Sequence, residues 1–195
     1  TPLYSSAASD VYKRQAPLVI TLREQFHLGY LGGIVIIQSI PYIVMPLAIP
    51  FWARLLDRVH VVRFRALHSW FFVAAQACVL IATLLHALPL MFVATVLLGI
   101  AFAGGALAWN LGHLDFAPAH KASQYMSVHV TLTGVRGLLA PLIAVSAYEW
   151  LDEAGASAWV FALSVVLCVA GAIGFVSLSR RMNPAPISRT PSPTP

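Results

Sequence analysis

Residues 66–114 read ALHSWFFVAAQACVLIATLLHALPLMFVATVLLGIAFAGGALAWNLGHL and contain no Asp, Glu, Lys or Arg. As a single α-helix this stretch would be about 73 Å long, at about 1.5 Å per residue. That length is more than twice the hydrocarbon core of a bilayer, which is about 30 Å thick. The stretch must therefore fold back once, and the sequence His86-Ala87-Leu88-Pro89 predicts the turn between two membrane-spanning helices.

The whole chain has the composition of a membrane protein. Of its 195 residues, 59% are hydrophobic and 10% are charged, whereas soluble domains carry about 25% charged residues. The fold class predicted is an all-α, multi-spanning bundle of five transmembrane helices in the lipid bilayer. The predicted spans are about 28–53, 66–85, 89–111, 125–148 and 157–178. The net charge of +5 does not predict a nucleic-acid partner, because the basic residues lie in short loops between apolar segments.

The two ends of the chain differ from the transmembrane domain, which we place at residues 16–181. Residues 1–15, TPLYSSAASDVYKRQ, are polar and resemble translated sequencing-adapter read-through, so we expect them to be non-native. Residues 16–22 resemble the last turns of a truncated helix, which predicts that the N-terminal part of the protein is missing. Residues 182–195 are rich in Pro, Ser and Thr and are predicted to form a disordered tail.

Basic residues are distributed unequally between the two sides of the predicted membrane. Only Arg23 lies on one side, together with several acidic residues. The other side holds Arg54, Arg58, Arg63, Arg65, Lys121, Arg180, Arg181 and Arg189. The positive-inside rule places this second side in the cytoplasm. We therefore expect an integral protein of the inner or plasma membrane with a cytoplasmic C-terminus.

A polar stripe interrupts the fourth predicted span. Arg136 falls near its middle, where an arginine costs about 2.5–3.5 kcal/mol on insertion scales. His129, Thr133 and Arg136 follow an i, i+4, i+7 spacing that aligns them on one helix face. We interpret the stripe as the lining of a substrate or ion pathway. The alternative is a structural ion pair between Arg136 and an acid in the missing half of the protein.

The connection between the third and fourth spans also carries polar residues. Asn110 is assigned to the same pathway, and Asp115 is interpreted as a charge partner. His113, Asp115 and His120 match no established metal-ligand spacing, so no metal and no other cofactor is predicted. These three residues are nevertheless the only candidates for the alternative of an integral membrane enzyme. A further alternative is a structural or sensory subunit without transport.

The first predicted cytoplasmic loop, Ala53-Arg54-Leu55-Leu56-Asp57-Arg58-Val59-His60, resembles the loop signature Gly-x-Leu-x-Asp-Arg-x-Gly of the major facilitator superfamily. Leu55, Asp57 and Arg58 match, whereas Ala53 and His60 replace the two glycines. In that family the loop is a conformational latch, so the resemblance implies this role for Asp57, Arg58 and Arg54. The alternative is an ordinary positively charged loop.

The resemblance covers roughly residues 16–181 and implies secondary active transport of a small solute by alternating access, not catalysis. The best register is helices eight to twelve of a twelve-helix transporter, and helices two to six are the alternative. The missing N-terminal half of the same chain would then be a partner. Arg136 favours an anionic solute or a carboxylate partner, and a coupling proton or ion is compatible with this reading.

Overall fold

The computed structural model describes residues 17–182 and is helical throughout its regular elements. After a short helix at residues 17–24, the chain forms α2 (Tyr30–Ile34), η1 (Val35–Ser39), α3 (Ile40–Leu56), α4 (Val61–Leu84), α5 (Leu88–Leu111), η2 (Gly112–Asp115), η3 (Ala119–Lys121), α6 (Ala122–Glu153), η4 (Ser157–Trp159) and α7 (Val160–Arg181). Within the described residues, five helices are long and apolar enough to cross a membrane. The prediction of an all-α membrane bundle with five such helices is therefore confirmed. The predicted non-native segment and disordered tail lie outside the described residues, except for Met182.

The first of these five helices, Leu31–Leu56, is continuous but changes its hydrogen-bonding pattern. It passes from α2 through the π-helical turn η1 into α3. Pro41, near the start of α3, has no N–H to offer the carbonyl of Ile37 four residues earlier. A wider π turn directly before the proline accommodates the ring while keeping the helix continuous.

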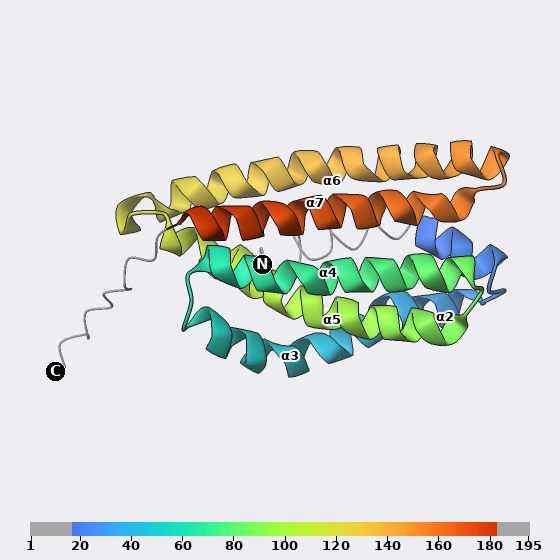
Figure 1. Ribbon diagram of the computed structural model, residues 1–195, viewed down its shortest axis with the longest axis horizontal. Helices are drawn as coiled ribbons and strands as arrows, with labels where there is room; N and C mark the ends of the chain where they lie inside the picture. The colour runs from blue at the N-terminus through green and yellow to red at the C-terminus, as the bar shows by residue number, and fades with distance from the viewer. Residues whose placement is uncertain (1–16, 183–195) are drawn as a thin grey trace.

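The helices pack as a layered array rather than around one axis (Figure 1). α4 packs along both α5 and α7, and α5 packs along α3 on its other side. The link between α4 and α5 turns at residues 85–87, where His86 has a φ of 52°. α6 lies beside α7 but makes few contacts with it. Only Thr133 and Tyr148 are buried along its whole length.

Two buried side chains fasten α3 and α4 to α5. The indole Nε1 of Trp52 donates to the carbonyl of Ile100 at 2.8 Å, and Nε2 of His68 lies 2.6 Å from the carbonyl oxygen of Ala101. Because a carbonyl only accepts, Nε2 of His68 carries a proton in this contact. The two rings meet edge to face with centroids 5.2 Å apart. These two contacts hold α3 and α4 to the carbonyls of neighbouring residues in α5.

The close approach of α4 to α5 requires a glycine at position 104. A Cβ atom added there would lie 2.7 Å from Nε2 of His68, whose ring is held by its contact with the carbonyl of Ala101. Gly105 is different, because a Cβ there would meet only Phe72 and His68 at 3.7 and 3.9 Å, which is ordinary contact. Small residues let membrane helices approach closely, and here they admit an imidazole ring.

Candidate functional site

α6 positions the three residues of the predicted polar stripe. Thr133 is buried, with 9% of the residue exposed, whereas Arg136 is exposed on the described structure. His129 is half-buried, and its ring lies 3.8 Å from the Trp109 ring of α5, centroid to centroid, at an interplanar angle of 45°. The stripe therefore begins at the contact between α5 and α6 and continues along α6 to Arg136.

Asn110 lies next to this contact but uses its amide locally. Its Nδ2 donates to the carbonyl of Ala106, one turn earlier in α5, at 2.7 Å. The amide is half-buried, and its Oδ1 is the group that remains for an outside donor. The role of Asn110 in a pathway stays a prediction.

A second polar stripe, which the sequence analysis missed, follows another face of α6. Ser127 Oγ donates to the carbonyl of Ser123, and Thr131 Oγ1 donates to the carbonyl of Ser127, each at 2.9 Å. Thr131 is two residues from both His129 and Thr133, so it lies about 200° around the helix from each of them. The i, i+4 spacing of Ser123, Ser127 and Thr131 was a signal available in the sequence.

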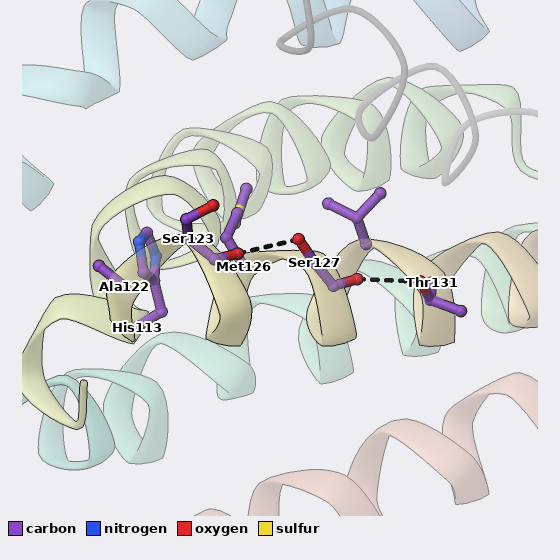
Figure 2. A pocket seen from close by; sticks show the side chains of 7 residues that line it. His113, Ala122, Ser123, Met126, Ser127 and Thr131 are labelled. Carbon is purple, nitrogen blue, oxygen red and sulfur yellow. Dashed lines mark hydrogen bonds between the residues drawn. The ribbon is translucent and has the colours of Figure 1, made fainter. Parts of the chain in front are cut away.

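This second stripe borders a hollow of about 550 Å³ at the N-terminal end of α6 (Figure 2). The hollow is lined by His113, Ala122, Ser123, Met126, Ser127, Val130 and Thr131. The hollow is shallow and largely open, because one helix and His113 supply its whole described lining. Nδ1 of His113 is buried and has no hydrogen-bond partner among residues 17–182.

The α3–α4 and α5–α6 loops meet at one end of the bundle (Figure 1). The Oδ2 atom of Asp115 accepts a 2.8 Å hydrogen bond from the backbone N–H of Val61, the first residue of α4. His60 Nδ1 accepts from the next N–H, that of Val62, at 3.2 Å. A carboxylate at a helix N-terminus satisfies an orphan amide and the positive end of the helix dipole.

Two further contacts hold the same loops together. The rings of His60 and Phe116 meet edge to face with centroids 5.1 Å apart. Gly112 lies against Val61 so closely that an added Cβ would be 2.7 Å from its Cγ2. We call this set of contacts, from His60 and Val61 to Gly112, Asp115 and Phe116, the loop clasp.

The predicted latch residues lie at the end of α3, beside the loop clasp in sequence. Asp57 is the C-cap of α3, and its N–H donates to the carbonyl of Ala53 at 2.9 Å. Arg54 lies in the last turn of α3, where a cation is favourable for the helix dipole. Arg58 follows in the turn and donates its N–H to the carbonyl of Leu55 at 3.0 Å. Asp115 places a carboxylate at the N-terminus of α4, a contact with a backbone amide that the sequence did not predict. The latch role of Asp57, Arg58 and Arg54 stays a prediction.

The arrangement offers no metal centre within the part of the chain that the structure describes. No three His, Cys, Asp or Glu residues there are grouped to hold a metal ion. Asp115 is engaged with the start of α4, and His113 lines the hollow.

Comparison with known proteins identifies the family. The chain matches the family model of the Major Facilitator Superfamily over residues 10–195, which is nearly its whole length. No curated protein and no solved structure gave a significant match. The match, together with five helices suited to crossing a membrane, makes this an integral membrane protein. The chain belongs to the Major Facilitator Superfamily, a family of transporters.

Proposed function

We propose that this chain forms helices eight to twelve of a secondary active transporter that moves a small solute by alternating access. In such transporters two helical halves rock about a site near the bilayer midplane. The other half would be the N-terminal part of the same chain. The observation that carries the proposal is the stripe of His129, Thr133 and Arg136 along a spanning helix of a transporter family.

The cost of a charge in lipid supports a pathway role for this stripe. Arg136 lies in the middle of α6 and is exposed on the surface of the described helices. Leaving a charged side chain in hydrocarbon is costly, so intramembrane cations face protein or a water-filled cavity. A pathway between two halves supplies such an environment. There Arg136 binds an anionic solute or a carboxylate of the other half, and a proton or ion couples to transport.

We further propose that the loop clasp and the latch residues act together. Asp57, Arg58 and Arg54 are in the loop whose signature resembles the family latch, and Asp115 holds the start of the next helix beside them. Release of one contact would free the loops to follow α6 as it moves. This end of the bundle carries the basic loops, which supports a cytoplasmic location and a cytoplasmic C-terminus in the inner or plasma membrane.

Transport by the complete gene product in proteoliposomes tests the proposal. We would screen uptake of gluconate, inorganic phosphate, sorbitol and putrescine, and then compare variants on any transported solute. Arg136→Ala should lower uptake at least about tenfold, because the anionic group that pairs with the Arg136 guanidinium is then left desolvated and unpaired. Val135→Ala is the matched control, since Val135 is an exposed apolar neighbour. Equal uptake by Arg136→Ala and the parent protein, at equal expression, would refute the role of Arg136.

A further inference from the structure

The hollow beside α6 has an unusual balance of hydrogen-bonding groups. The hydroxyl protons of Ser127 and Thr131 are already donated to backbone carbonyls of α6. A hydroxyl has one proton and two lone pairs, so both oxygens are left as acceptors for anything that enters the hollow. Figure 2 shows both side chains, with these two hydrogen bonds, along the lining.

The hydroxyl of Ser123 also lines the hollow, and His113 adds a polar group from a different element. It belongs to η2, before the start of α6, and its Nδ1 is buried without a partner among residues 17–182. A buried polar atom without a hydrogen bond costs free energy, so a ligand that pairs with Nδ1 gains affinity. Depending on the tautomer, Nδ1 donates or accepts.

Charge is absent from the described lining of the hollow. No Asp, Glu, Lys or Arg is among the described residues that border it, and Met126 and Val130 supply an apolar wall. An anion would lose water there and meet oxygen lone pairs, while a cation would meet no carboxylate. An uncharged solute with several hydroxyl groups can satisfy the polar groups of Ser127, Thr131 and His113. One hydroxyl donates to Ser127, a second donates to Thr131, and a third donates to or accepts from Nδ1 of His113, according to the tautomer.

We propose that this hollow binds an uncharged, hydroxyl-bearing solute such as a polyol. That this solute is the transported cargo rests on the proposed function. That the hollow binds the solute does not depend on transport. The hollow and the Arg136 stripe lie on different faces of α6. Arg136 then pairs with a carboxylate of the protein, and the cargo carries no charge.

The test is a binding titration on the complete gene product in lipid nanodiscs, followed by the ¹⁵N chemical shift of the His113 imidazole. The probes are sorbitol and gluconate, which have the same six-carbon skeleton but differ by a carboxylate. Sorbitol should shift the His113 signal saturably, and gluconate should bind at least about tenfold more weakly. The double substitution Ser127→Ala with Thr131→Val should weaken sorbitol binding at least about tenfold.

Two controls keep this result interpretable. Thr131→Ser retains the hydroxyl and should retain binding, which separates loss of the acceptor from disturbance of the helix. Ser179→Ala removes a hydroxyl that also donates to its own helix, but in α7, and should leave binding unchanged. No saturable shift with sorbitol, equal binding of gluconate, or unchanged binding by the double variant would each overturn the inference.

Flux measurements separate this inference from the proposed function. Saturable binding of sorbitol without sorbitol flux by the complete gene product in proteoliposomes would support the site but refute sorbitol as cargo. Flux of another solute, without any shift of His113 by sorbitol, would support transport and overturn the site.

Discussion

Single residues at helix ends and crossings set the geometry of this protein. Asp115 shows this most simply, because one carboxylate oxygen joins the α5–α6 loop to the first N–H of α4. The contact spans a long separation in sequence and joins the two loops that the proposal assigns to conformational change.

Removing this cap should destabilise the fold. Asp115→Ala should lower the free energy of unfolding by about 1 kcal/mol, the usual cost of losing an N-terminal cap. Asp115→Asn keeps an oxygen that accepts from Val61 and should lose less than half of that. Reversible unfolding in mixed detergent and SDS micelles measures both. Equal stability of the alanine variant and the parent would show that the contact contributes nothing.

Gly104 gives a second prediction with a matched neighbour. Gly104→Ala places a methyl group against the His68 ring and should cost about 1–3 kcal/mol, as overpacking does. Gly105→Ala has room for its methyl group and should be neutral or slightly stabilising. The same unfolding assay compares them. If both variants unfold alike, the ring of His68 does not occupy the position described.

These residues also mark the limit of what the sequence predicts. Spacing alone aligned His129, Thr133 and Arg136 on one face, because helical periodicity is local. The pairing of His68 with Gly104 depends on the register between α4 and α5, and that of Asp115 with Val61 on how two loops meet. No local pattern encodes either register, so neither contact was predicted.

At the scale of elements, α6 differs from the other spanning helices because it has three kinds of surface. One face carries His129, Thr133 and Arg136, and a second carries Ser123, Ser127 and Thr131. The third face is apolar and exposed, with Val128, Val135, Leu139 and Leu142. The second stripe was not predicted from the sequence. Serine and threonine hydroxyls that donate to their own helix lower the hydropathy of an apolar span only slightly.

Cysteine labelling should reveal these three faces. In a background with Cys78→Ala and Cys168→Ala, single cysteines along residues 127–142 of the complete protein would be treated with a membrane-impermeant maleimide. Because the thiolate forms in water and not in lipid, cysteines on the two polar faces should react at least about tenfold faster than those on the apolar face. A labelling rate without helical periodicity would contradict this assignment of faces.

At the scale of the whole molecule, the sequence predicted the architecture well. Charge-free segments of membrane-spanning length are expected to form helices, because every backbone N–H and C=O group in lipid must find its hydrogen-bond partner within the same segment. The five spanning helices and the membership of a transporter family follow that expectation. The sequence did not predict the packing order of the helices. In the structure α4 lies between α5 and α7, and few residues of α6 are buried.

Few side chains of α6 are buried in the described structure, and this bears on how the helix could take part in transport. A helix with polar groups on two faces and little burial in the described structure is suited to a boundary that opens and closes. We therefore expect α6 to line a pathway that is open alternately to the two sides of the membrane.

Accessibility of Arg136→Cys from each side of the membrane tests this expectation. Arg136 is the exposed member of the first polar stripe, whereas Thr133 is buried within the described helices. The variant, in the complete protein without Cys78 and Cys168, would be treated with impermeant maleimide in right-side-out and in inside-out vesicles. Val135→Cys, its neighbour on the apolar face, serves as the unreactive control. Alternating access predicts that the cysteine at position 136 reacts from both sides, while the control reacts from neither. Labelling of position 136 from one side only, or from neither, would contradict alternating access along α6.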